Sequence, residues 1–266
     1  MGQRLGPNKV RVRGVLQPIR DALKLRNKQI NNLTISSFWF YYLRASMILG
    51  LTLTLWVRRT INPPLVRLKI TILIIILILR INSIKVILRG WRTFRKYPLL
   101  GAMRTVRQLI SYEVILYLIL LCFIFLTSRF NFYSVNFYKS NIIIFTSPII
   151  FYLWVPAMLA DLNRTPYDFR EGERELVRGY NTEYGARGFT LIFLREYRNI
   201  AFFSLITAIL FIQNYKIITT IFLFIIFSII WIRATLPRLR FDKLIILAWK
   251  FFIPFGTIIF LIFLLQ

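Results

Sequence analysis

The sequence contains no histidine and only one cysteine, Cys122. Without histidine, the chain has neither imidazole acid–base groups nor imidazole metal ligands, so any proton chemistry must use carboxylates, lysines or tyrosines. A single cysteine excludes a disulfide within the chain and leaves no cysteine cluster for zinc or an iron–sulfur centre. The commonest metal and redox sites are therefore excluded from this chain.

Acidic residues are also scarce, with 10 Asp and Glu against 36 Lys and Arg and a formal net charge of +26. The bases interrupt apolar segments instead of forming one polar domain, so we expect no nucleic-acid partner. Hydrophobic residues make up 57% of the chain and its mean hydropathy is +0.62, more apolar sequence than a soluble domain of this length buries. The sequence therefore predicts a protein whose surroundings are membrane lipid.

Seven continuous apolar runs come close to the length of about 20 residues with which a helix crosses a bilayer. They do not alternate as the strands of a membrane barrel do. We predict a single membrane domain over 1–266, an all-α polytopic bundle with spans at about 36–57, 68–88, 109–127, 141–160, 189–212, 217–234 and 247–265. Segment 15–27, with Pro18 near its first turn, is typical of an amphipathic helix lying at the interface.

The basic residues lie mostly on one side of this predicted topology. Connections 1–35, 89–108, 161–188 and 235–250 hold 8, 6, 5 and 4 Lys and Arg, whereas 58–67, 128–140 and 213–216 hold 3, 2 and 1. Positively charged loops stay in the compartment of synthesis. We therefore expect the first group of loops to face the cytosol of a bacterium or the matrix of a mitochondrion.

The few carboxylates concentrate on the same side. Six of the ten lie between residues 168 and 196, and Asp161 comes just before them. A solvated acidic loop is the ordinary interpretation of such a cluster. However, Glu113 stands near the start of the third predicted span and Glu196 lies within the fifth. Ionisable groups at membrane depth are costly and are by default functional candidates.

The loop and its flanks carry a specific resemblance. Residues 160–197 read ADLNRTPYDFREGERELVRGYNTEYGARGFTLIFLREY. This segment resembles the acidic loop of the quinone-site membrane subunit (subunit 1) family of respiratory complex I. Further matches in the same order are Gly-Pro-Asn-Lys at 6–9, Gln-Pro at 17–18, Gly-Trp at 90–91, the Gln-x-x-Ser-Tyr-Glu element at 108–113 and the Trp-x-Arg-Ala-Thr element at 231–235.

The resemblance implies a core membrane subunit of proton-pumping NADH:ubiquinone oxidoreductase in the mitochondrial inner membrane, with its basic loops in the matrix. Ubiquinone would be the substrate, while NADH, FMN and the iron–sulfur clusters would be bound by partner subunits of the complex and none by this chain. The subunit would be inert alone. The family has eight spans, and its first helix precedes the Gly-Pro-Asn-Lys loop, so we expect that helix to be missing here.

The resemblance also assigns roles to individual residues. Carboxylates of the proton-coupling quinone chamber would be Glu113, Asp161, Asp168, Glu171, Glu173, Glu175, Glu183 and Glu196. Arg104, Arg164 and Lys96 would be their counter-charges, and Gln17, Pro18, Asp21 and Lys24 would line the quinone portal. No metal site is expected.

Three further classes of protein stay open at this point. The first is a stand-alone proton or cation transporter, which would show an inverted repeat and broken helices, neither of which is evident. The second is a related subunit of a membrane-bound hydrogenase, and the third is a purely structural membrane scaffold. The concentration of carboxylates in one loop argues against the scaffold.

The arginines depart from the family pattern. Arg44, Arg80, Arg195 and Arg198 interrupt apolar spans, at a cost of roughly 2.5–3.5 kcal/mol each on insertion scales. Several others stand where the family usually has serine or another small residue. Invertebrate mitochondria read AGA and AGG as serine, so our hypothesis is that these arginines are serines in the native protein. The competing interpretation is that they are true arginines, which snorkel or pair with Glu.

Overall fold

The computed structural model describes residues 14, 16–28, 71–92, 95–127, 148–169, 172–173, 186–211 and 218–265. Within these ranges the regular structure is helical and no strand occurs, which confirms the predicted all-α class. The predicted span at 36–57, the start of the one at 141–160, and site residues Glu171, Glu175 and Glu183 lie outside the described residues.

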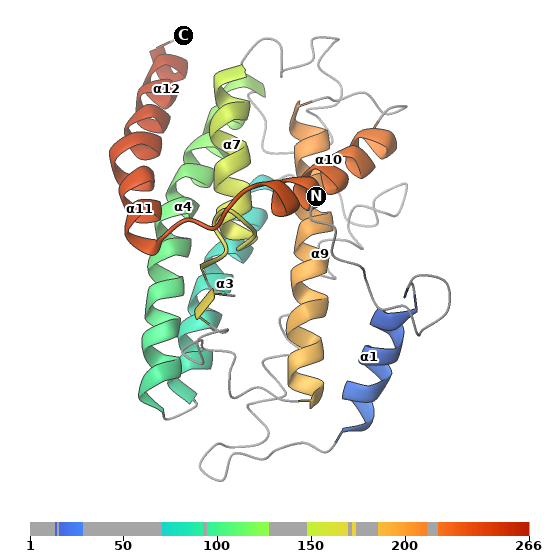
Figure 1. Ribbon diagram of the computed structural model, residues 1–266. Coiled ribbons are helices and arrows are strands. Elements are labelled where there is room, and N and C mark those ends of the chain that lie inside the picture. Colours follow the sequence, from blue (N-terminus) through green and yellow to red (C-terminus); the bar gives the residue numbers. More distant parts are fainter. Residues whose placement is uncertain are drawn as a thin grey trace.

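The helices follow the predicted apolar runs closely at most positions. In chain order they are α1 (Gln17–Asn27), α3 (Thr71–Arg92), α4 (Lys96–Thr127), α7 (Pro148–Asp161), α9 (Ala186–Phe211), α10 (Ile218–Thr235), α11 (Phe241–Leu247), the π-helix η2 (Ala248–Phe252) and α12 (Ile253–Leu265). The last three form one continuous rod that ends near the C-terminus (Figure 1).

Helix α4 lies at the centre of the packing, because α3, α7 and α12 all contact it (Figure 1). The largest fully buried side chains include Tyr112, Phe123, Trp154 and Phe211. Phe123 and Phe211 meet edge to face, with ring centroids 5.2 Å apart. This geometry suits aromatic rings and joins α9 to α4 across the core.

Helix α4 begins at Lys96, well before the span expected at 109–127. Pro98 stands in its first turn, where a missing N–H costs nothing. At 1.5 Å per residue, its 32 residues reach about 48 Å, beyond the ~30 Å of the hydrocarbon core. The helix therefore continues past the apolar stretch into the polar segment, which hydropathy alone does not reveal.

Three helices among the described residues are long and apolar enough to cross a membrane: Lys96–Phe125, Ile218–Thr235 and Phe241–Leu265. The second and third expose large apolar side chains, such as Phe224 on α10 and Phe255 on α12. Apolar surface of this extent is typical of contact with lipid or protein rather than water. Helix α9 is also long enough but carries Arg195, Glu196 and Arg198 within one turn.

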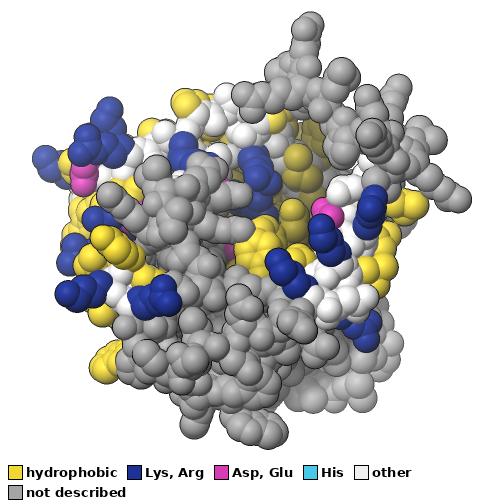
Figure 2. Space-filling view, turned by 60° about the horizontal axis from the view of Figure 1, so that its bottom comes forward, with side chains coloured by type: hydrophobic (Ala, Val, Ile, Leu, Met, Phe, Trp, Pro, Cys, Tyr) yellow, Lys and Arg dark blue, Asp and Glu magenta, His cyan; other side chains and the backbone are white. Residues whose placement is uncertain are grey.

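Lys and Arg side chains lie in several separate groups over the face shown in Figure 2, with few Asp or Glu visible among them. Helix α3 ends and α4 begins at the lower end of the view in Figure 1. Arg95, Lys96 and Arg107 are exposed there. Helix α1 lies at the same end, packed beside α9 (Figure 1). The side of the membrane on which these basic residues lie stays a prediction.

Candidate functional site

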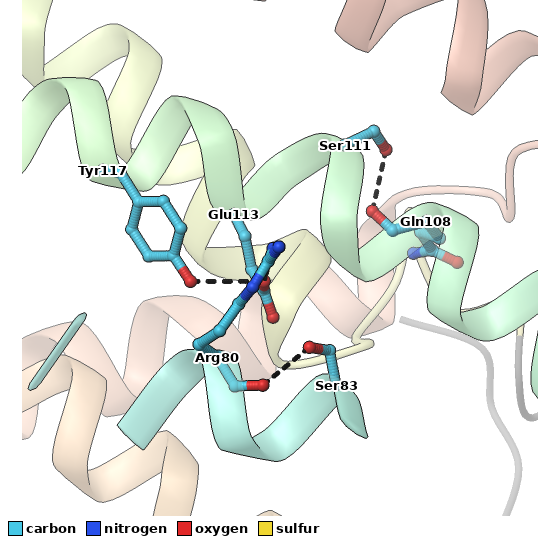
Figure 3. A network of polar contacts seen from close by, with 6 residues as sticks. All are labelled: Arg80, Ser83, Gln108, Ser111, Glu113 and Tyr117. Carbon is cyan, nitrogen blue, oxygen red and sulfur yellow. Dashed lines mark hydrogen bonds and ion pairs between the residues drawn. The ribbon is translucent and has the colours of Figure 1, made fainter. Parts of the chain in front are cut away.

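The carboxylate of Glu113 is completely buried on α4 and faces α3. Its Oε2 atom accepts a hydrogen bond of 3.2 Å from the Tyr117 hydroxyl and lies 3.7 Å from Nη1 of Arg80 (Figure 3). The Arg80 side chain is 57% exposed, so its charge is partly solvated while the carboxylate's is not. A buried ionised carboxylate is costly unless it is paired and hydrogen-bonded, and these two contacts serve that purpose.

Two further groups lie near Glu113. The Ser83 hydroxyl on α3 donates a 2.8 Å hydrogen bond to the Arg80 carbonyl, on the side of the helix that faces Glu113 (Figure 3). Asp161, the last residue of α7, is close enough for an electrostatic interaction with Glu113. The structure thus brings together two of the predicted carboxylates from helices far apart in the sequence.

The segment after α7 folds back in a tight turn. Asn163 has φ 50°, in the left-handed region that asparagine tolerates better than most residues. Its side-chain amide donates a hydrogen bond of 2.9 Å to the Asp161 carbonyl, and the Arg164 N–H donates one of 3.1 Å to the Leu159 carbonyl. The Thr165–Pro166 peptide bond is cis. This turn directs Tyr167 and Asp168 into the bundle, where both are buried.

Helix α4 holds this segment at two points. The buried side-chain amide of Gln108 donates a hydrogen bond of 2.8 Å to the Tyr167 carbonyl. One turn earlier on α4, Nη1 of Arg104 donates a hydrogen bond of 2.9 Å to Oε1 of Glu173, whose side chain is 4% exposed. Arg104 and Glu173 therefore form an ion pair between α4 and the acidic segment, while the counter-charge role that the resemblance assigns to Arg104 stays a prediction.

Other elements reach the same turn. The Leu239 N–H donates a hydrogen bond of 3.0 Å to the Pro166 carbonyl. The Arg164 guanidinium lies 5.3 Å from the centre of the Tyr197 ring on α9. The latter distance is within the range of cation–π attraction. The described part of the acidic loop is thus tied to α4, α9 and the segment between α10 and α11, rather than extended into solvent.

Burial changes the acidity of two groups in this loop. Burial raises the pKa of the Glu173 carboxyl above its ordinary value, although the hydrogen bond and charge of Arg104 act in the opposite direction. Burial also raises the pKa of Tyr167 to about 12, with a smaller contribution from Tyr152. Glu173 is therefore a carboxyl that binds a proton more tightly than one in water.

The remaining predicted residues occupy the edges of the site. Glu196 lies on α9 and is partly buried, and Lys96 is exposed at the first residue of α4. On α1, the Gln17 side-chain amide donates an exposed hydrogen bond of 3.1 Å to Oδ1 of Asp21. Pro18 stands at the start of the helix, as expected. Lys24 lies in the last turn of α1.

Sequence reasoning missed three contacts of this site. Tyr117 lies four residues after Glu113, a spacing that places both on one helix face and that could have identified it. No sequence signal pairs Arg80 with Glu113 across α3 and α4. The third contact also has no signal in the sequence: the Tyr112 hydroxyl donates a hydrogen bond of 3.0 Å to the Leu244 carbonyl in α11.

No group of three or more His, Cys, Asp or Glu side chains able to hold a metal ion occurs in the described ranges. The chemistry available in this part of the chain is therefore proton binding, ion pairing and hydrogen bonding by carboxylates, phenols and guanidinium groups.

Comparison with known proteins places the chain among respiratory enzymes. The family model described as NADH dehydrogenase matches residues 1–264. The chain is 42% identical over 257 residues to NADH-ubiquinone oxidoreductase chain 1 of Aedes aegypti, covering 94% of this chain and 82% of the relative. The same protein of Anopheles gambiae is 42% identical over 256 residues, covering 94% and 81%. That of Bradypus variegatus is 37% identical over 266 residues, covering 96% and 83%.

Proposed function

This chain belongs to the NADH dehydrogenase family, as a membrane subunit of respiratory complex I, and we propose that it forms part of the ubiquinone chamber and couples quinone reduction to proton movement. Its relatives are named as oxidoreductases of NADH and ubiquinone, which favours this proposal over a hydrogenase subunit or a stand-alone transporter. The complex lies in the mitochondrial inner membrane, and we place the basic loops in the matrix.

The observation that carries the proposal is the burial of Glu113 together with its link to the acidic loop. Glu113 interacts electrostatically with Asp161, which directly precedes the turn that Gln108 and Arg104 hold against α4. Two carboxylates, Glu113 inside the bundle and Asp161 at the start of the acidic segment, therefore interact directly. Adding negative charge nearby, as reduction of a quinone does, makes both carboxyl groups bind protons more tightly.

The division of labour within the complex follows from the residues that this chain offers. NADH, FMN and the iron–sulfur clusters need nucleotide-binding motifs or cysteine ligands, and the chain has no histidine and one cysteine. We assign those groups to partner subunits. The apolar quinone tail needs an apolar groove, and we assign its entrance to α1, where Ile19 and Leu23 are exposed beside Gln17, Asp21 and Lys24.

The test is Glu113→Gln in the assembled complex, because glutamine keeps the shape of the side chain but cannot ionise. We expect normal assembly, a lower rate of NADH:ubiquinone reduction and fewer protons pumped per NADH in inner-membrane vesicles. Asp242→Asn is the matched control. Asp242 lies on α11, its side chain is 61% exposed, and it forms an ion pair with Arg240 just before that helix. Full and tightly coupled turnover of the Glu113→Gln complex would refute the proton role.

A further inference from the structure

The hydroxyl of Tyr117 donates a hydrogen bond to the Glu113 carboxylate (Figure 3). Its oxygen lies 3.2 Å from Oε2, whereas Nη1 of Arg80 lies 3.7 Å away, beyond ordinary hydrogen-bond length. A carboxylate that is wholly buried thus receives a direct hydrogen bond from a neutral phenol, and the Ser83 side chain on α3 is a second neutral hydrogen-bonding partner.

The helix explains why Tyr117 can make this bond. Side chains on an α-helix lean toward its N-terminus, so the residue at i+4 reaches back over residue i. Tyr117 is partly buried between α4 and α3, and its ring extends along α4 until the hydroxyl meets the carboxylate. The bond therefore requires no rearrangement of either helix.

A phenol suits a carboxyl group that gains and loses a proton. It stays protonated at neutral pH, because its ordinary pKa is about 10. Its oxygen both donates and accepts. The hydroxyl can therefore donate to the ionised carboxylate and, after rotation, accept from the protonated acid. Arg80, by contrast, can only donate, and its positive charge favours the ionised form over the protonated acid.

We propose that Tyr117 is a positioning residue for Glu113, which holds the carboxyl group against α3 in both its protonation states. The inference rests on the proposed function, since it concerns the proton-binding role of Glu113 there. It adds a residue on α4 to the coupling path that the sequence comparison does not assign. A purely structural role, in which the ring only fills space between two helices, would be met equally well by phenylalanine.

Other ionisable groups around Glu113 must be considered in any test that varies pH. Arg80 lies on α3 and Asp161 at the end of α7. Among the remaining elements that pack on α4, the π-helix η2 contributes only the exposed Lys250, α11 contributes the exposed Asp242 and Lys243, and α12 contains no Asp, Glu, Lys or Arg. None of these groups is altered by a change at Tyr117.

The experiment is Tyr117→Phe in the assembled complex, which removes one oxygen and keeps the ring. We expect normal assembly and an unchanged KM for ubiquinone. A hydrogen bond to a charged group is stronger than one to a neutral group, so the variant should disfavour the ionised carboxylate more than the protonated acid. The acidic limb of the pH dependence of kcat should therefore move to higher pH, by up to about one unit. Tyr152→Phe is the matched control, because Tyr152 is 71% exposed on α7, and it should leave the profile in place.

Two further variants separate the possible outcomes. Tyr117→Gln restores a group that both donates and accepts, and it should return the pH profile toward that of the wild type. In a Glu113→Gln background, Tyr117→Phe should cause no further shift, because the titrating partner is gone. A shift of equal size in that background would overturn the inference by showing that Tyr117 acts on another group.

Failure of the inference is distinguishable from failure of the proposed function. If Glu113→Gln impairs turnover while Tyr117→Phe matches the wild type at every pH, only the positioning role is refuted. If Glu113→Gln is fully active and coupled, the proposed function itself fails. Should Tyr117→Phe not assemble, infrared spectroscopy of the wild-type complex decides: the inference requires the carboxylate band that Glu113→Gln removes to lie at a hydrogen-bonded frequency.

Discussion

The side-chain amide of Gln108 donates a hydrogen bond of 2.8 Å to the backbone carbonyl of Tyr167, 59 residues further along the chain. Both residues are buried, and the Tyr167 ring lies edge to face against Tyr112, one turn after Gln108 on α4. The start of the acidic loop is therefore fixed to the central helix by a bond that water does not replace.

Loss of this bond should loosen the loop. Gln108→Met keeps the length of the side chain but removes its amide, leaving the buried Tyr167 carbonyl without that donor. We expect a loss of about 1–3 kcal/mol of local stability and faster hydrogen–deuterium exchange over 162–169. Gln17→Met, at a partly exposed position on α1, should leave exchange in this loop unchanged. Equal exchange in the Gln108 variant and the wild type would contradict the anchoring role.

The pair of Arg104 and Glu173 should respond asymmetrically to mutation. Arg104→Met leaves a buried carboxylate without its cation and should lower stability by roughly 1–3 kcal/mol, less than for a fully buried pair because Arg104 is 47% exposed. Glu173→Gln keeps an acceptor for Arg104 and should cost much less. The double variant should be more stable than Arg104→Met alone in thermal unfolding of the purified complex. Additive losses would exclude direct coupling between the two side chains.

The pH dependence of stability should reveal Glu173. Its pKa in the folded protein is raised by burial, so the folded state holds this proton more tightly than the unfolded state does. The stabilisation is complete below the ordinary pKa of a glutamate, about 4.3, and is lost as pH rises through the folded-state value. Glu173→Gln cannot ionise, so its Tm should fall less than that of the wild type across this range. Parallel Tm–pH curves for the two proteins would contradict the shift.

At Gly90, α3 approaches α4 closely. A Cβ atom built on Gly90 would clash with the Cβ of Ala102 and would lie 3.0 Å from the Pro98 carbonyl oxygen. Gly90→Ala should therefore push the two helices apart at a cost of about 1–3 kcal/mol, measured as a lower Tm and less assembled complex. Gly256→Ala on α12 is the control, since its Cβ would only touch a Leu118 methyl group at 3.4 Å. Equal Tm values for the two variants would contradict the close contact.

The native protein should carry serine at several positions where the translated sequence has arginine. We predict serine at 195 and 198, where α9 otherwise holds two cations beside Glu196 within an apolar helix, and at 80. Mass spectrometry of chymotryptic peptides from the native subunit measures this directly. Arginine at 195 and 198 would end the hypothesis. With serine at 80, Glu113 would lose its ion pair but keep the bond from Tyr117, so the test of Tyr117 applies in either case.

Hydropathy averaged over about 20 residues decides whether a segment prefers lipid to water, and this preference needs no partner. For that reason the sequence alone determined the membrane class and the helical fold, whereas the positions of the spans stay a prediction. It also supplied the candidate carboxylates, because an ionisable residue within an apolar run is evident from its neighbours in the chain.

Contacts between residues far apart in the sequence depend on how the helices pack, and no local pattern encodes them. Only the tertiary structure decided that Glu113 faces Arg80 and lies near Asp161, that Arg104 pairs with Glu173, and that Gln108 holds Tyr167. The early start of α4 at Lys96 belongs with these results. A polar segment continues a helix when neighbouring elements pack against it, and hydropathy does not measure that packing.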